Sequence, residues 1–205
     1  PAPPRSSARA APSDSVRRPR SRLSFLALAQ AWGDEAHPRI AVYDIASGTW
    51  KHAFYPLDTP VSQNGGWVGL SDIAPAGPGR FLVLERDNQG GPDAAIKRVY
   101  SIDLGDYSFA DGTVLAKQLY RDLLPDLLGL RGQVFEKVEG LAVTACGAVW
   151  VNNDNDGVMD NSGEQALLNV ATVATTQAKG DKKAAKCAKS AKKSKKKKVK
   201  SSKKR

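Results

Sequence analysis

Oxygen-bearing side chains gather in one short stretch that follows two apolar, strand-like segments. Four of these residues have the spacing of metal ligands: Asn152, Asp154, Asp156 and Asp160. Gly157 stands where a calcium-binding loop makes its sharp bend, and alternate side chains of such a loop turn inward to bind the ion. The spacing therefore predicts a calcium site in this stretch.

The same stretch also fits a simpler structure. A calcium loop carries a bidentate carboxylate at its twelfth position, but that position here is Gly163, and Glu164 comes one residue later. Asn and Asp also favour solvated turns, because their side chains bond to nearby backbone groups. A β-turn around residues 156 and 157 is therefore the alternative to a metal site.

Apolar, β-branched and aromatic runs between glycine-rich turns predict strands through the middle of the chain. The expected strands are 39–45, 49–57, 67–74, 80–87, 96–104, 114–122, 138–144, 148–152 and 165–173. Residues 23–32 fit a strand or a short helix, and 123–130 a short helix. Residues 81–84 are apolar without alternation, which predicts a strand covered on both faces.

Two of the expected hairpins, at 69–88 and 140–156, resemble each other, and each ends on acidic or amide residues. Repeated units of short antiparallel strands are typical of β-propeller blades. We therefore expect an all-β fold of antiparallel, propeller-like blades, about two to three in this chain, with an open sandwich as the alternative. Closed propellers have about four to eight blades, so we expect a fragment or processed product that lacks N-terminal blades.

The net charge of +10 is distributed unevenly along the chain. Residues 179–205 carry 15 Lys or Arg and one Asp, a net charge of +14, and residues 1–22 carry six Arg and one Asp, a net charge of +5. Residues 23–178 carry 10 basic and 19 acidic side chains, a net charge of −9. The sequence thus predicts an acidic folded domain at 23–178 between two disordered basic tails.

Several common functional motifs are absent from the sequence. There is no G-x-S-x-G elbow, Walker loop, dinucleotide fingerprint or zinc spacing. No run of 18 or more apolar residues occurs, so no membrane-spanning helix is expected. Cys146 falls in a predicted turn and Cys187 in the lysine-rich tail, so a disulfide framework is not indicated.

Three segments resemble the bacterial phytase-like domain called "esterase-like activity of phytase": RIAVYDIASGTWKHAFYPLD, GLSDIAPAGPGRFLVLERDNQGGPDAAIKRVYSIDL and KVEGLAVTACGAVWVNNDNDG. The resemblance covers residues 23–170 and corresponds to the later part of that domain. Cys146 departs from the polar turn residue of the family, and the two tails have no counterpart in it. The resemblance implies a propeller-like fold and an extracellular or cell-envelope location.

The resemblance also implies calcium-assisted hydrolysis of phosphate esters, or of carboxylic esters. Carboxylates would hold cations that bridge phosphate oxygens and activate water, while Lys or Arg neutralises developing charge. The predicted catalytic carboxylates are Glu85, Asp87 and Glu139, and the predicted substrate-binding cations are Arg86, Lys97 and Arg98. Strand-end carboxylates more often pair with a neighbouring Arg or face water, and this is the structural alternative for each of them.

Two functions stay open at this point. One is an exported, calcium-dependent esterase-like propeller acting on a small phosphate ester. The other is a non-catalytic propeller in which calcium only fixes a loop and the lysine-rich tail tethers the domain to an anionic cell-envelope polymer. No aromatic residue is interleaved with the lysines, so base stacking on nucleic acid is not expected, and a tail that only solubilises the protein is the alternative.

Overall fold

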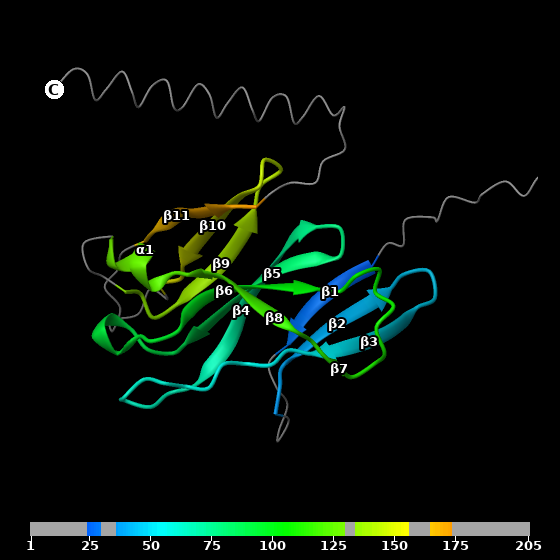
Figure 1. Ribbon diagram of the computed structural model, residues 1–205, viewed down its shortest axis with the longest axis horizontal. Coiled ribbons are helices and arrows are strands. Elements are labelled where there is room, and N and C mark those ends of the chain that lie inside the picture. Colours follow the sequence, from blue (N-terminus) through cyan, green and yellow to red (C-terminus); the bar gives the residue numbers. More distant parts are fainter. Residues whose placement is uncertain (1–23, 30–35, 130–133, 156–164, 174–205) are drawn as a thin grey trace, which may run out of the picture.

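The computed structural model describes residues 24–29, 36–129, 134–155 and 165–173, and this part of the chain is an all-β structure (Figure 1). Its strands form three sheets: sheet A in the order β1-β2-β3-β7, sheet B in the order β4-β5-β6-β8 and sheet C in the order β11-β10-β9. The strands are β1 (Ser24–Ala29), β2 (Arg39–Asp44), β3 (Thr49–Phe54), β4 (Val68–Gly77), β5 (Arg80–Asp87), β6 (Lys97–Asp103), β7 (Thr113–Val114), β8 (Lys117–Asp122), β9 (Val138–Val143), β10 (Ala148–Asn153) and β11 (Leu167–Thr172).

Two short helical segments interrupt the strands, the 3-10 helix η1 (Gly91–Asp93) and α1 (Leu124–Leu128). Pro125 lies in the first turn of α1, where its missing N–H costs no hydrogen bond, and Leu127 is buried. This confirms the predicted short helix at 123–130. None of the helices in the described part of the chain is long and apolar enough to cross a membrane.

The predicted strands are present, but the strand predicted at 114–122 is wrong as one element. The chain pairs with β3 in parallel at β7, and then pairs antiparallel with β6 at β8. Between them Leu115 is buried, and its N–H donates to the Phe54 carbonyl over 2.9 Å. The chain therefore crosses from sheet A to sheet B at this residue.

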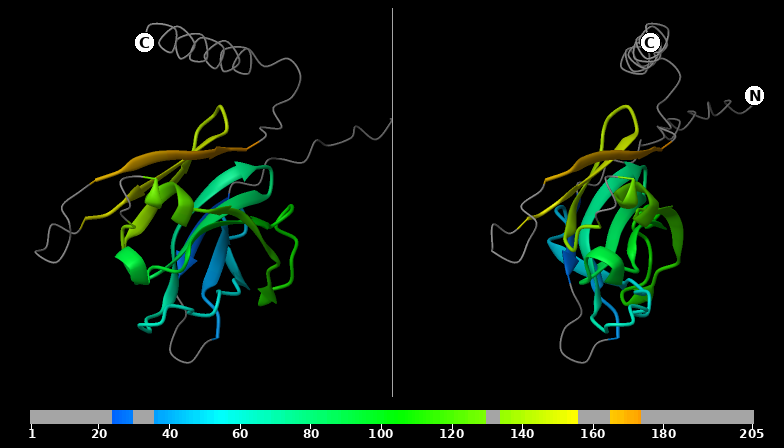
Figure 2. Two further views of the ribbon diagram at one scale, coloured as in Figure 1. Left: turned by 60° about the vertical axis from the view of Figure 1, so that its left-hand side comes forward. Right: turned by 90° about the vertical axis from the view of Figure 1, so that its left-hand side faces the viewer.

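Sheet B lies between sheets A and C (Figures 1 and 2). Leu82 and Leu84 of β5 pack in the apolar core shared with sheet C, while Phe81 and Val83 pack in the core shared with sheet A. All four side chains are buried. The prediction of a strand covered on both faces at 81–84 is therefore confirmed.

The first strands of the three sheets lie next to one another. β4 packs against β9 and also contacts β1. The Asp72 carboxylate of β4 accepts a hydrogen bond from the Leu141 N–H of β9 over 2.7 Å, which joins sheets B and C directly. The sheets therefore approach each other along β1, β4 and β9.

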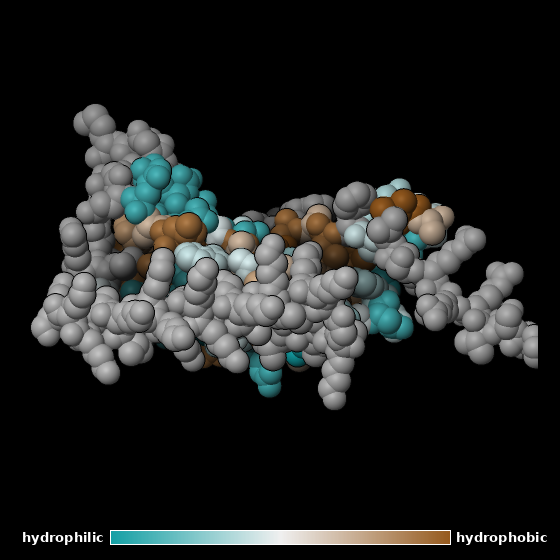
Figure 3. All heavy atoms as spheres, turned by 90° about the horizontal axis from the view of Figure 1, so that it is seen from above, coloured by the Kyte–Doolittle hydropathy of each residue, from teal (hydrophilic) through white to brown (hydrophobic). Residues whose placement is uncertain are grey.

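The described surface has apolar side chains between hydrophilic ones (Figure 3). The large apolar side chains that are exposed include Ile45, Trp50, Val61, Trp67, Val114, Leu119, Leu128 and Leu167. The predicted tails at 1–22 and 179–205, together with Asp156 and Asp160, lie outside the described residues.

We expect Leu84→Ala to lower the free energy of unfolding by about 2–5 kcal/mol, because it leaves a cavity in a fully buried site between two sheets. Leu119→Ala is the matched control, since Leu119 is 56% exposed on β8. This control should change stability by no more than about 0.5 kcal/mol. Denaturant unfolding of both variants measures the difference, and similar losses would contradict the two-faced packing of β5.

Candidate functional site

Charged side chains from distant segments meet at one end of sheets B and C. β5 ends there, and β4, β6 and β9 begin there, because Val68 pairs with Asp87, Arg86 with Lys97, and Val138 with Asn153. Arg86, Asp87, Lys97 and Glu139, four of the predicted site residues, are thereby brought together. Their closeness could not be derived from their spacing alone.

The predicted site residues divide between the two faces of sheet B. Arg86 lies on the same face as Leu84, toward sheet C, while Glu85 lies on the same face as Val83, toward sheet A. In β6, Lys97 likewise faces sheet C and Arg98 faces sheet A. Neighbouring residues of one strand therefore belong to two separate clusters.

Arg86 and Glu139 line a cavity of about 210 Å³ between β4, β5 and β9. The other lining residues are Trp67, Gly69, Leu70 and Ser71. The Arg86 guanidinium donates to a Glu139 carboxylate oxygen through one terminal nitrogen and to Ser71 Oγ through Nε at 3.3 Å. The Trp67 ring lies over the guanidinium, with the ring centre 5.4 Å from the guanidinium carbon. The guanidinium is thus held from three sides.

Two β-bulges direct side chains toward Arg86. In β4 the register shifts between Leu70 and Asp72, which leaves Ser71 without a partner residue in β5. In β9, Val138 pairs with Asn153 and Gly140 with Asn152, so Glu139 is the extra residue. Bulges re-aim side chains and occur often beside functional sites. The two extra residues, Ser71 and Glu139, are the ones that contact Arg86.

Lys97 and Asp87 form a buried ion pair next to Arg86 along β5 and β6. Lys97 Nζ lies 2.7 Å from Asp87 Oδ1, and it also reaches the carbonyl oxygens of Asp87 (2.8 Å), Gln89 (2.7 Å) and Glu136 (2.8 Å). The other carboxylate oxygen of Asp87 accepts the N–H groups of Ala95 and Ile96. This pair connects the end of sheet B to the segment that enters sheet C.

Burial and hydrogen bonding shift the pKa values of both Asp87 and Lys97. Burial alone would raise the pKa of Asp87, but hydrogen bonds from Lys97 and from two backbone N–H groups outweigh it, so the pKa lies below its ordinary value of 3.8. Burial lowers the pKa of Lys97 below its ordinary value, although the Asp87 carboxylate opposes this shift.

A second polar cluster lies between sheets A and B. Glu85 accepts hydrogen bonds from Tyr55 Oη at 2.8 Å and Lys117 Nζ at 2.7 Å. Asp58 binds the same Lys117 at 2.8 Å and Arg98 at 2.5 Å. Burial would raise the pKa of Asp58, but these cations, with a tyrosine hydroxyl, hold it below its ordinary value. The cluster contains two carboxylates and two cationic side chains, so its charges cancel.

Tyr100 completes the second cluster, with its hydroxyl 2.5 Å from Asp58 Oδ2. The pKa of Tyr100 is raised to about 12, mainly by burial and secondly by this hydrogen bond. Glu85 is fully buried among its partners, as Lys97 is on the other face. In this conformation Glu85, Asp87, Lys97 and Arg98 make internal contacts, and their predicted roles in a reaction stay predictions.

The predicted calcium loop is only partly within the described residues. Asn152 is exposed, and its side-chain Oδ1 lies so close to Gly140 that a Cβ there would require the Asn152 side chain to move. Asp154 is also exposed, and its backbone N–H donates to the Lys137 carbonyl over 2.9 Å. Among the described residues, no three His, Cys, Asp or Glu side chains form a group that could hold a metal. The calcium site stays a prediction.

Cys146, at the turn between β9 and β10, is disulfide-bonded. The sequence has one other cysteine, Cys187, outside the described residues. A disulfide framework was not indicated by the sequence, and this one bond was not anticipated. A single cysteine in a turn gives no sequence signal of this kind, because pairing depends on what the fold brings near it.

Several residues of both clusters were missed by the sequence reasoning. They are Tyr55, Asp58, Trp67, Ser71 and Lys117. Trp67 begins the strand predicted at 67–74, but no sequence signal marks a bulge at Ser71 or brings the loop residue Asp58 back to β6 and β8.

A family model described as "Phytase-like: Esterase-like activity of phytase" matches residues 16–157. The chain belongs to this phytase-like family. The match includes the Arg86 cavity and the Lys97–Asp87 pair and ends before β11. No curated protein and no solved structure matches the chain.

The lowered pKa of Asp87 predicts loss of stability in acid. Its carboxylate favours the folded state, so this stabilisation is fully present above the ordinary pKa of 3.8 and is lost as the pH falls through the lower folded-state pKa. Unfolding free energies measured by denaturant from pH 6 down to about pH 2 should therefore fall less steeply for Asp87→Asn than for the unaltered chain. The same pH dependence in both proteins would show that protonation of Asp87 does not cause the loss of stability in acid.

Proposed function

We propose that this phytase-like chain contributes to hydrolysis of phosphate esters at the end of sheets B and C where the Arg86 cavity lies. The observation that carries the proposal is the buried Arg86 guanidinium, held in a cavity by Trp67, Ser71 and Glu139. Arginine presents several N–H donors in one plane, which suits a tetrahedral anion with several oxygens. Family membership supports the same reaction class.

In this proposal Arg86 binds the phosphate group and Glu139 acts as general base. Glu139 is suited to this because its side chain is 36% exposed at the cavity, so water reaches a carboxylate that already lies beside the anion site. Phosphate binding would replace Glu139 on one guanidinium nitrogen and free the carboxylate to accept a proton from the attacking water. Trp67 would cover the apolar part of the substrate.

We also propose calcium as the cofactor, at the loop that begins with Asn152 and Asp154. Amide and carboxylate oxygens are the ligands that calcium prefers, and both side chains are exposed. A bound calcium ion would neutralise charge on the phosphate. Calcium should raise the melting temperature of the chain, and Asp154→Ala should remove that increase whether or not the protein is catalytic.

The propeller interpretation belongs to the same proposal. Three sheets that stack face to face and meet along β1, β4 and β9 fit propeller blades, with sheet B as a complete four-stranded blade. An extracellular or cell-envelope location belongs to the same proposal, and family membership supports it.

A non-catalytic domain is the second candidate. Glu85, Asp87, Lys97 and Arg98 pair with other residues inside the protein. This pairing favours a non-catalytic domain, because it explains these four charged residues by a role in the fold. The lysine-rich segment 179–205 would then hold the domain on an anionic polymer.

Steady-state hydrolysis of a panel of small phosphate esters separates the two candidates. We expect Arg86→Gln to lower kcat/KM by about 100-fold or more, because it removes a charge that stabilises the transition state. Arg121→Gln is the matched control, since Arg121 pairs with Asp126 and does not line the Arg86 cavity, so this change should leave kcat/KM unchanged. Unaltered turnover in Arg86→Gln would overturn the assignment, and absence of turnover in the unaltered chain would favour the non-catalytic domain.

A further inference from the structure

Ser71 carries a hydroxyl group at the Arg86 cavity that the proposed hydrolysis does not use. Among the described residues that line this cavity, no other side chain has a hydroxyl group. The bulge in β4 leaves Ser71 without a partner residue in β5, and its side chain contacts Arg86. A serine hydroxyl between an anion-binding cation and a carboxylate has the surroundings of a nucleophile.

Arg86 polarises the Ser71 hydroxyl in the direction that nucleophilic attack requires. Arg86 Nε donates to Ser71 Oγ over 3.3 Å, so the serine oxygen is the acceptor. A cation that donates to a hydroxyl oxygen favours the deprotonated form of that hydroxyl. Within the described part of the chain this is the one hydrogen bond of the Ser71 side chain, so its own hydrogen stays available to a base.

Glu139 is the carboxylate that can take this hydrogen. It accepts from Nη2 of the same guanidinium, and Nε and Nη2 lie along one edge of that group. Ser71 and Glu139 are therefore neighbours at one cation, and both line the cavity. In this structure each binds the guanidinium rather than the other. Phosphate binding to Arg86 would free Glu139, and catalytic hydrogen bonds often tighten only when substrate is bound.

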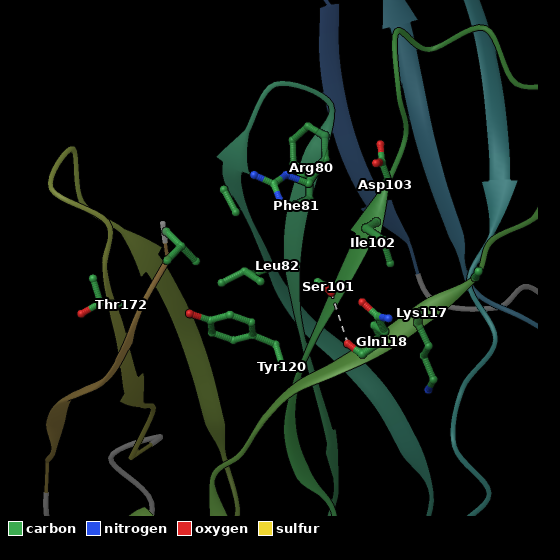
Figure 4. A pocket seen from close by; sticks show the side chains of 13 residues that line it. Arg80, Phe81, Leu82, Ser101, Ile102, Asp103, Lys117, Gln118, Tyr120 and Thr172 are labelled. Carbon is green, nitrogen blue, oxygen red and sulfur yellow. Dashed lines mark hydrogen bonds between the residues drawn. The ribbon is translucent and has the colours of Figure 1, made fainter. Parts of the chain in front are cut away.

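Ser101 shows a different arrangement elsewhere in sheet B. It lies on β6 beside a separate cavity of about 570 Å³ (Figure 4). Its Oγ donates to the Gln118 carbonyl over 3.4 Å, the dashed line in Figure 4. A carbonyl oxygen is not a base that can remove the proton, so Ser101 is not activated in this way. Ser101 is therefore a matched control for Ser71.

We propose that Ser71 is the nucleophile of the proposed hydrolysis, and that the reaction passes through a phosphoserine at this position. This step rests on the proposed function and adds a covalent stage to it. Ser71 Oγ bonds to phosphorus while the bond from phosphorus to the leaving-group oxygen breaks, and the hydroxyl proton passes to Glu139. Glu139 then gives this proton to the departing alkoxide.

Water acts in the second stage. Glu139, again a carboxylate, accepts a proton from the water, whose oxygen bonds to phosphorus while the bond from phosphorus to Ser71 Oγ breaks. The proton passes from Glu139 to Ser71, which restores the hydroxyl, and inorganic phosphate leaves. Arg86 neutralises charge on the phosphate oxygens in both stages.

Covalent labelling of the full chain with diisopropyl fluorophosphate tests the nucleophile directly. Attack by Ser71 Oγ on phosphorus expels fluoride and leaves a diisopropylphosphoryl group on the serine. We expect peptide mass spectrometry to place the label on Ser71, Ser71→Ala to remove it and Ser101→Ala to keep it. Glu139→Gln should slow the labelling by about 100-fold, because the general base is lost. A chain without label on Ser71 would overturn the proposal.

Turnover of the phosphate-ester panel distinguishes failure of this step from failure of the proposed function. Ser71→Ala should lower kcat by about 100-fold or more, and Ser101→Ala should leave it unchanged. Label on Ser71 without turnover of any ester would support the nucleophile and contradict the proposed hydrolysis. Turnover that Ser71→Ala retains would overturn the nucleophile and leave direct attack by water as the reaction.

Discussion

One buried ammonium group holds the candidate site in place. Lys97 Nζ has no access to solvent and lies within 2.8 Å of four oxygens, from Asp87, Gln89 and Glu136. These oxygens belong to the end of β5, the loop after it and the segment that enters β9. A buried cation is tolerated only where such partners satisfy it, so the three segments must keep their positions for Lys97 to stay charged. Arg86 and Glu139 lie next to these segments, on β5 and β9.

Strand alternation gives the two faces of sheet B different chemistry. Alternation along β5 and β6 sends Arg86 and Lys97 toward sheet C, and Glu85 and Arg98 toward sheet A. On the sheet A side, acids and bases pair with each other and close the cluster. On the sheet C side, the bulges at Ser71 and Glu139 leave room for a cavity beside Arg86. The cavity beside Arg86 therefore lies on the sheet C face of sheet B.

Much of the fold could be predicted from the sequence, because strand length, alternation and glycine turns are local properties. The hairpins at 69–88 and 140–156 and the doubly covered run at 81–84 follow from such patterns. The crossover at Leu115 could not be predicted, since only two residues, the buried Leu115 and the exposed Ala116, separate two strands of different sheets. The site was predicted less well: Glu85 and Arg86 are neighbours in sequence but lie on opposite faces, while Arg86 and Glu139 are 53 residues apart and in contact. Such pairings depend on register and bulges, which the sequence pattern does not specify.

The central claim is that the Lys97 ion pair fixes the ends of sheets B and C. Denaturant unfolding of Lys97→Met tests it most directly, because methionine keeps the length of the side chain and leaves Asp87 buried without its cation. The account predicts a loss of about 3–5 kcal/mol in the free energy of unfolding. The control Lys51→Met, at a partly exposed lysine of β3, should lose less than about 1 kcal/mol. Equal losses in the two variants would contradict the account.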